Sequence, residues 1–163
     1  MAAPSPRLWL PLTLLALPTT AIDNGVAQVP PLGWASWNTH GALVNATHIM
    51  RQADAMVSLG LVDLGYRYLE IDEPGFLRWP NGTLRTNLTR FPDGMAAVGD
   101  YLHARGLKFG MYSSAGPLTC AGSAAPPAYT HGWAGMGGHE CSDANQFAQW
   151  GVDYLFEECV CTL

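Results

Sequence analysis

The stretch YRYLEIDEPGF, residues 66–76, decides how this sequence is interpreted, because a strand-like apolar run in it ends in acid. Glu70, Asp72 and Glu73 crowd around Ile71, although an unpaired charge buried in a core is strongly destabilising. Side chains of a strand alternate between two faces, and a Pro-Gly turn ends this strand directly after the acids. We therefore expect Asp72 and Glu73 to lie at the rim of a sheet, solvated or bound to a ligand.

Strand and helix signals alternate outward from this stretch. Short apolar or aromatic runs predict strands, and periodic segments between them predict helices that begin at capping residues and end near glycines. This alternation indicates a parallel sheet with right-handed crossovers. The expected strands span 32–38, 66–72, 107–114 and 152–156; the expected helices span 47–59, 93–105 and 142–150, with caps at Thr47, Asp93, and Ser142 or Asp143; residues 73–92 are expected to form a long loop.

Two architectures fit this order, a doubly wound open sheet and part of a (β/α)8 barrel. No G-x-G-x-x-G or P-loop motif follows a strand, so a nucleotide-binding sheet loses support. Polar residues gather where the expected strands end, and in a barrel these carboxyl ends form the active face. They are Asn38, Asp72, Glu73, residues 112–114, Glu157 and Glu158. We predict an α/β fold, the N-terminal half of a (β/α)8 TIM barrel with about four β/α units.

The first residues have the pattern of a secretory signal peptide. Arg7 supplies a positive charge ahead of an apolar run at residues 8–17, which is too short to cross a bilayer, since that needs about 20 residues. Small residues then precede a cleavage site after Ala21. We expect residues 1–21 to be removed and the protein to enter the secretory pathway, for export or for a lysosome or vacuole.

Sequons and cysteines agree with secretion. Asn45, Asn81 and Asn87 each begin an N-x-[ST] sequon, so at least one glycan on an exposed loop is expected. The four cysteines lie in the second half of the chain, and an oxidising compartment favours disulfides among them, with three possible pairings. A zinc site is disfavoured, because Cys159-x-Cys161 does not have the C-x-x-C spacing.

Composition and charge argue against some classes of partner. Hydrophobic residues make up 48% of the chain and charged residues 13%, which suits a globular core, and the net charge is −5. A mildly acidic chain without a cluster of Lys or Arg argues against nucleic acid and against an anionic membrane as partner.

Five motifs, taken in order, resemble the glycoside hydrolase family of α-galactosidases and α-N-acetylgalactosaminidases, the melibiases. They are PPLGWASWNTHG, GYRYLEIDE, RFPDG followed by LHARGLKFGMYSSAG, TCAG, and FAQWGVDYLFEECVC, within residues 30–161. The resemblance implies that residues 30–163 are part of a (β/α)8 catalytic barrel that hydrolyses terminal α-linked galactose with retention, without a metal or other cofactor. The expected partner is an α-galactoside oligosaccharide or glycoconjugate.

The resemblance assigns substrate-binding roles to individual residues. Trp37 matches an aromatic that packs on the sugar, and its ring suits the apolar face of galactose. Asp72 and Glu73 match paired acids that bind galactose hydroxyls, although the family has Asp where Glu73 stands, and Tyr112 matches a pocket tyrosine. Ionised carboxylates accept several hydrogen bonds each, which fits a ring of hydroxyl donors. In the alternative, Asp72 and Glu73 pair with Arg67 or Arg78 at a strand end.

The resemblance also pairs two cysteines beside the pocket. Cys120 and Cys159 match a family disulfide, and Cys120 is therefore expected to border the substrate. Cys141 and Cys161 remain available for a second pair.

Three further polar residues, Glu70, His40 and His131, are given no role in substrate binding. Glu70 is expected to pair with Lys108 on the next strand. His40 and His131 have no partner that the sequence can name, and they are interpreted as loop residues.

The fourth strand departs from the family pattern. The family places its nucleophile, an Asp, in a Lys-x-Asp motif there, whereas this sequence has no Lys and has Glu in place of Asp. Alignment on Gly151 makes Glu158 the nucleophile, and alignment on the cysteines makes it Glu157, on the opposite face of an extended strand. We favour Glu157 from the cysteine spacing. The added methylene shifts the carboxylate by about 1 Å, and misplacement of that size costs about 100-fold in rate.

The length departs from the family as well. Four strand units contain no counterpart of the family's acid/base residue, and retaining hydrolysis needs two carboxyl groups about 5–5.5 Å apart. We therefore expect the 163 residues to be part of a longer hydrolase. Two alternatives stay open: α-N-acetylgalactosaminidase specificity, and a catalytically inactive secreted sugar-binding protein.

Overall fold

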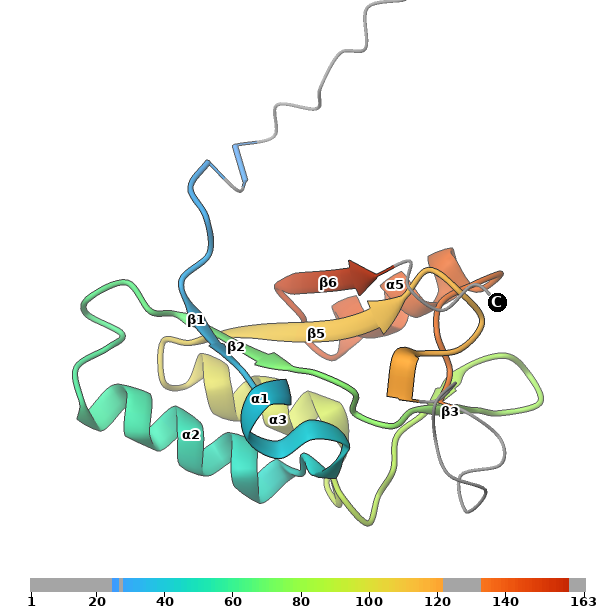
Figure 1. Ribbon diagram of the computed structural model, residues 1–163, viewed down its shortest axis with the longest axis horizontal. Helices are drawn as coiled ribbons and strands as arrows, with labels where there is room; N and C mark the ends of the chain where they lie inside the picture. Colours follow the sequence, from blue (N-terminus) through green and yellow to red (C-terminus); the bar gives the residue numbers. More distant parts are fainter. Residues whose placement is uncertain (1–24, 27, 122–132, 159–163) are drawn as a thin grey trace, which may run out of the picture.

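Four parallel strands form the main sheet of the chain (Figure 1). The computed structural model describes residues 25–26, 28–121 and 133–158, so the expected signal peptide lies outside the described residues. The strands are β1 (Gly33–Ala35), β2 (Tyr68–Ile71), β5 (Lys108–Ser114) and β6 (Tyr154–Glu158), in the order β1-β2-β5-β6 across the sheet. The four predicted strands are confirmed, and each pairs in parallel with its neighbour.

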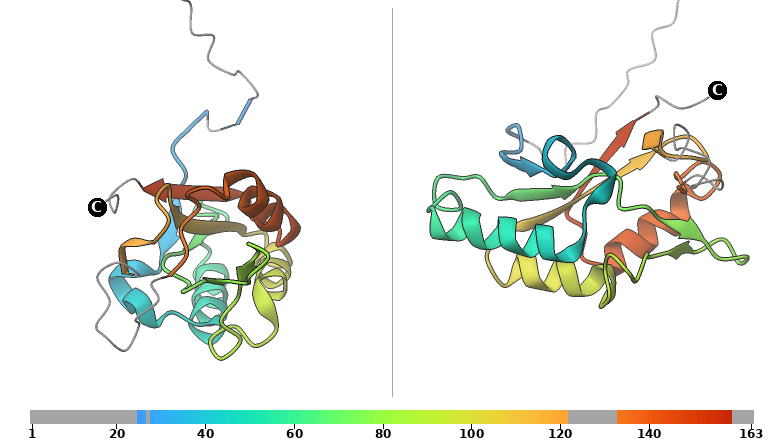
Figure 2. Two further views of the ribbon diagram at one scale, coloured as in Figure 1. Left: turned by 90° about the vertical axis from the view of Figure 1, so that its right-hand side faces the viewer. Right: turned by 60° about the horizontal axis from the view of Figure 1, so that its bottom comes forward.

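Three longer helices cover one face of this sheet (Figure 2). They are α2 (Ala46–Ser58), α3 (Gly94–His103) and α5 (Glu140–Gln149), which alternate with the strands of the sheet. A doubly wound sheet carries helices on both faces, whereas a barrel wall carries them on its outside only. The one-sided arrangement therefore favours the barrel. No helix in the described ranges is long and apolar enough to cross a membrane.

The core fills the layer between the sheet and these helices. Leu69 and Ile71 of β2, and Phe109 and Met111 of β5, are completely buried there. The helices add Ile49, Ala53 and Met56 from α2, Met95, Val98 and Leu102 from α3, and Phe147 from α5. Each large side chain removed from water in this way contributes about 1.5–3 kcal/mol. Because strand side chains alternate, the opposite face of the sheet is left to residues such as Glu70 and Tyr112.

Two helices begin at other residues than the sequence predicts. The cap of α2 is Asn45 and not Thr47, because Oδ1 of Asn45 accepts a hydrogen bond from the amide of His48 at 3.0 Å. α5 begins at Glu140, three residues before Asp143, which the sequence places at the start of the helix. Asp143 is not available as a cap, because its carboxylate is engaged elsewhere.

A short antiparallel hairpin interrupts the segment that was expected to be a long loop. β3 (Leu77–Arg78) pairs with β4 (Leu84–Arg85) as a second, two-stranded sheet. Strands of two residues are too short to show an alternating hydrophobic pattern, so periodicity could not reveal them.

Arg78 anchors this hairpin to α5. Its guanidinium donates to both carboxylate oxygens of Asp143, at 2.8 and 2.5 Å, and also to the carbonyls of Gly82 and Gly135. The side chain of Asp143 is 0% exposed, so this forked ion pair is desolvated. The interpretation that Arg78 pairs with Asp72 or Glu73 is therefore wrong.

Replacing Arg78 by Met is expected to lower the free energy of unfolding by about 3 kcal/mol, because the carboxylate of Asp143 would stay buried without its partner. Urea or thermal unfolding measures the change. Arg85→Met is the matched control, since Arg85 is an exposed arginine of the same hairpin, and it should cost less than about 1 kcal/mol. Equal losses in the two variants would contradict a special role for the buried pair.

Candidate active site at the carboxyl edge of the sheet

Four carboxyl groups gather at the face of the sheet that the helices leave open. Strand register places Glu70 beside Gly110, and Glu158 beside Ser114. The charge of Glu158 helps to raise the pKa values of Glu70, Asp72 and Glu73, and burial is the larger cause in each case. These carboxyls, from β2, the turn after it and β6, therefore act on one another electrostatically.

The placement of the two β6 glutamates reverses our preference between them. Leu155 lies beside Met111 and packs on the core, and Glu157, two residues on, shares that face and is exposed. Glu158 points to the opposite side, where Sγ of Cys120 lies 3.8 Å from its Oε2. Strand register, and not the cysteine spacing, decides which glutamate joins the acidic cluster. The residue that does so is Glu158.

Asp72 is held at the end of β2 by a serine that the sequence reasoning did not single out. The backbone amide of Asp72 donates to Oγ of Ser36 at 2.9 Å, and Ser36 is completely buried at the end of β1. Burial raises the pKa of Asp72 to about 7, with further contributions from the charges of Glu70, Glu73 and Glu158. A small hydroxyl residue at a strand end, next to a tryptophan, was the available signal for Ser36.

Glu73 is buried, so of the two states expected for it, solvated or bound to a ligand, the solvated one is wrong and the bound one stays a prediction. Its side chain accepts a hydrogen bond at Oε1 from the amide of Ala121 at 2.7 Å, and the residue is 2% exposed. Oε2 has no hydrogen-bond partner among the described residues. The backbone has a φ of 50°, a region that residues with a side chain seldom adopt, and such strain concentrates at functional sites. Burial raises the pKa of Glu73, and hydrogen bonds from Thr119 and Ala121 oppose this.

Arg90 braces the turn that carries Glu73. Its guanidinium donates to the carbonyl of Pro74 at 3.0 Å and to the carbonyl of Ala42, which joins the segments that follow β1 and β2. Gly75 has a φ of 77°, which favours glycine, and a Cβ there would lie 2.5 Å from Nη1 of Arg90 and would displace this guanidinium. Arg90 begins the RFPDG motif, but no local sequence pattern reveals this bracing role.

The other expected binding residues lie at the same edge. Trp37 begins a short helix, α1 (Trp37–His40), directly after β1 and is 44% exposed, so it is not a core residue. The hydroxyl of Tyr112 accepts a long hydrogen bond, 3.5 Å, from the amide of Cys120. Burial is the main reason that the pKa of Tyr112 is raised. Cys159 lies outside the described residues, so its pairing with Cys120 stays a prediction, as does that of Cys141 with Cys161.

Lys108 does not pair with Glu70, contrary to expectation. Its Nζ lies 3.4 Å from the hydroxyl of Tyr68, its neighbour across the strands, and 5.2 Å from the centre of that ring. Glu70 lies two register positions further on, opposite Gly110. The acidic cluster therefore gains no counter-charge from this lysine.

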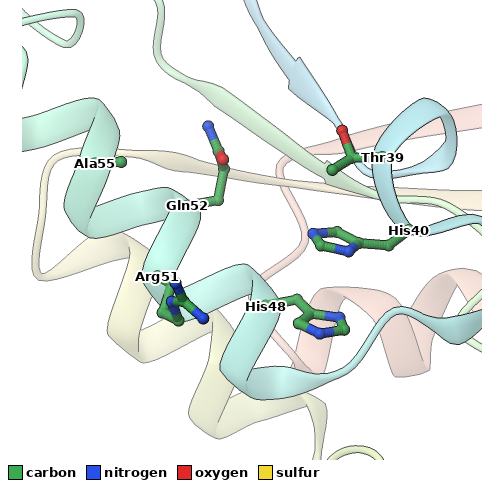
Figure 3. Close-up of a pocket in the computed structure, with 6 residues that line it drawn as sticks. All are labelled: Thr39, His40, His48, Arg51, Gln52 and Ala55. Atoms are coloured by element: carbon green, nitrogen blue, oxygen red, sulfur yellow. The ribbon is translucent and has the colours of Figure 1, made fainter.

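A separate cavity of about 370 Å³ lies between α1 and α2 (Figure 3). The rings of His40 and His48 stack there with centroids 4.0 Å apart and planes at 7°, so His40 has a partner that the sequence did not reveal. Burial lowers the pKa of His48, and the charges of His40 and Arg51 add to this. The lining residues are Thr39, His40, His48, Arg51, Gln52 and Ala55. None of them belongs to the acidic cluster.

Half of a barrel wall, with carboxyls and an exposed tryptophan at the carboxyl ends of its strands, has the polar edge that forms the active face of barrel enzymes. The Melibiase_2 family model, described as Alpha galactosidase A, matches residues 29–162. The alpha-galactosidase of Cyamopsis tetragonoloba is 44% identical over 140 residues, which cover 84% of this chain and 32% of that protein. The chain belongs to this alpha-galactosidase family.

Solved structures show the same relationship. Alpha-galactosidase I from Mortierella vinacea superposes with a TM-score of 0.76 at 39% identity, over 85% of this chain and 33% of that one. The alpha-galactosidase from Saccharomyces cerevisiae with raffinose gives a TM-score of 0.75 at 38% identity, over 84% and 28% of the two chains. The predicted fold, the N-terminal half of a (β/α)8 barrel, is confirmed. The chain spans about a third of the length of its curated relatives, from 29% to 38%.

Replacing Asp72 by Asn is expected to raise the free energy of unfolding at pH 8 by about 2 kcal/mol and to leave it unchanged at pH 4. The folded chain holds the proton up to a pKa of about 7, whereas the unfolded chain releases it near the ordinary value of about 4. The stability of the native protein should therefore fall as the pH rises from about 4 through 7. The full shift of about three units corresponds to about 4 kcal/mol, which screening by water reduces.

Thermal and urea unfolding across this pH range measures the effect. Asp63→Asn is the control, because Asp63 is an exposed acid outside the cluster. If the Asp72 and Asp63 variants changed the pH dependence of stability equally, the proposed cost of ionising Asp72 in the folded protein would be disproved.

Proposed function

We propose that this chain forms the galactose-binding side of an α-galactosidase active site that acts on terminal α-linked galactose with retention. The observation that carries the proposal is the convergence of Asp72, Glu73 and Glu158 at one edge of the sheet, where the exposed Trp37 follows the neighbouring strand β1. Family membership supports it, and so does the likeness to the Saccharomyces cerevisiae alpha-galactosidase that was solved with raffinose. Raffinose is an α-galactoside, the class of substrate that we propose for this chain.

Each residue has a distinct task in this proposal. Asp72 and Glu73 accept hydrogen bonds from sugar hydroxyls, and Oε2 of Glu73, which has no hydrogen-bond partner within the described ranges, is an acceptor for one of them. Trp37 packs on the apolar face of the ring. Glu158 acts as the nucleophile that attacks the anomeric carbon, and a second carboxyl group protonates the leaving group. We assign no residue of this chain to that second role.

Two other functions remain as alternatives to this proposal. One is α-N-acetylgalactosaminidase specificity, and the other is a secreted sugar-binding protein without turnover. Preserved binding residues fit all three, and the altered fourth strand, with Glu158 in place of an Asp, supports the last.

We further propose that the protein passes through the secretory pathway, for export or for a lysosome or vacuole. The sequence of residues 1–21 supports a signal peptide, and the sequons at Asn45, Asn81 and Asn87 support glycosylation. A Cys120–Cys159 disulfide fits as well, because Cys120 lies beside Glu158, the residue next to Cys159. Peptide mapping without reductant tests this pairing, and a Cys120–Cys141 link would contradict it.

Galactose binding tests the site, and the two adjacent glutamates supply a matched pair of variants. Glu158→Gln should weaken galactose binding about 10- to 100-fold, as expected when a hydrogen bond to a charged group is lost. Glu157→Gln, on the exposed opposite face, should change it less than about 2-fold. Ligand-observed NMR titration with galactose, glucose and N-acetylgalactosamine measures the affinities. A larger effect from Glu157→Gln would refute the assignment of Glu158.

The choice of sugar separates the remaining alternatives. Tighter binding of N-acetylgalactosamine than of galactose would favour the α-N-acetylgalactosaminidase specificity. Equal binding of glucose, which differs from galactose in one hydroxyl, would count against a galactose site of any kind. Loss of galactose binding in Asp72→Asn, with folding intact, is the result that the proposal expects.

A further inference from the structure

The turn of the β3–β4 hairpin has a defined geometry. The amide of Gly82 donates to the carbonyl of Trp79, and the amide of Trp79 donates to the carbonyl of Thr83, both at 2.9 Å. Gly82 has a φ of 89°, in the left-handed region. This is the pattern of a three-residue hairpin loop closed by a glycine bulge, which fixes the direction of the side chains around it.

One face of the hairpin points inward and the other points to solvent. Arg78 reaches Asp143, and its cross-strand partner Leu84 is 4% exposed, so these two define the inner face. Strand alternation then places the neighbours of both residues on the outer face. These neighbours are Leu77 and Trp79 on one side of the turn, and Thr83 and Arg85 on the other.

The side chain of Asn81 is held on the outer face as well. Its Oδ1 accepts hydrogen bonds from the amide of Thr83 at 3.2 Å and from the hydroxyl of Thr83 at 2.8 Å. Trp79 is 50% exposed. Trp79, Asn81 and Thr83 therefore stand on one exposed face, at every second position around a single tight turn.

We propose that Asn81 carries an N-linked glycan whose first N-acetylglucosamine packs between Trp79 and Thr83, and that this contact stabilises the hairpin. Asn81, Gly82 and Thr83 form an N-x-T sequon, and the indole offers an aromatic surface to the apolar C–H face of the sugar ring. The proposal rests on the secretory route proposed above. It does not depend on galactoside binding.

The attachment is a group transfer from a lipid-linked oligosaccharide diphosphate. Nδ2 of Asn81 forms a bond to the anomeric carbon of the sugar, and the bond between that carbon and the diphosphate oxygen breaks. The lipid diphosphate leaves with the electron pair, and the amide nitrogen gives up one proton to the transferase.

A groove beside Trp79 extends the same face. It has a volume of about 390 Å³, and Leu77, Trp79 and Arg85 of the outer face line it together with residues 86–88. The guanidinium of Arg85 lies 5.0 Å from the centre of the Trp79 ring and holds the indole in place. The groove is therefore available to later sugars of the same glycan.

The other two sequons lack this arrangement. Asn45 is half-buried and caps α2 through its Oδ1, and Leu43 stands two residues before it. Asn87 is exposed, but Arg85 stands at the corresponding position. Among the three, Asn81 is the sequon with an aromatic residue two positions before it, so Asn87 serves as the internal control.

The test expresses the full chain behind an added host secretion leader in a eukaryotic host, so that the outcome does not depend on the chain's own first residues. Glycopeptide mass spectrometry should find Asn81 occupied. Trimming the glycan to one N-acetylglucosamine should leave a melting temperature about 2–4 °C above that of Asn81→Gln. This increment should disappear in Trp79→Ala and persist in Trp79→Phe, which keeps an aromatic face. Asn87→Gln should leave it intact.

Several outcomes would overturn the proposal. An unmodified Asn81 in secreted protein refutes the site, and an increment that survives Trp79→Ala refutes the stacking contact. If Trp79→Ala does not fold, Trp79→Phe decides alone. A Trp79→Phe protein whose melting temperature is the same with and without the sugar would refute the contact. Occupancy with the host leader but not with the native first residues would instead refute the secretory route, while the melting-temperature increment in the host-leader protein would still decide the contact.

Discussion

The parallel register of β1, β2, β5 and β6 is the constraint on which the rest of the structure depends. Strands that run in one direction bring their carboxyl ends to one edge, so the acids that follow β2 and end β6 meet although they are distant in sequence. The same register sets the faces: Ile71 and Met111 turn to the helices, whereas Glu70 turns away from them. A slip of one residue would exchange the two sets, so the core and the site are specified together.

The same register makes ionisation of the site's carboxyl groups unfavourable, because it brings them together in a buried place. Burial and mutual repulsion work against ionised Glu70, Asp72 and Glu73, and Lys108, the cation on the neighbouring strand, lies beside Tyr68 instead. The charge of Arg90 partly offsets the raised pKa of Glu73, and its guanidinium holds the turn in place. Such a site favours a ligand that donates hydrogen bonds through many neutral hydroxyl groups. Stability is given up where function requires acceptors, which is common at binding sites.

The sequence predicted the fold well because its signals were local and repeated. Four apolar strands, the helix expected over residues 47–59 and the acids after β2 could all be found from periodicity and turn residues. The failures concern contacts across the fold. Glu157 and Glu158 are distinguished only by the faces of β6 on which they lie. The buried Asp143 pairs with an arginine 65 positions away in the sequence. Ser36 and His48 make contacts with segments that no local pattern connects to them. The two-residue strands β3 and β4 are too short for any periodicity.

The long reach of Arg78 has a consequence for the order of events during synthesis. Its carboxylate partner is added to the chain 65 residues later, which at about 5–20 residues per second means a delay of roughly 3–13 s. During that interval the guanidinium remains hydrated, and the inner face of the hairpin has no α5 to dock against. The hairpin therefore completes its packing late, after β2, α3 and β5 have had time to assemble. Its outer turn is exposed to processing enzymes throughout the wait.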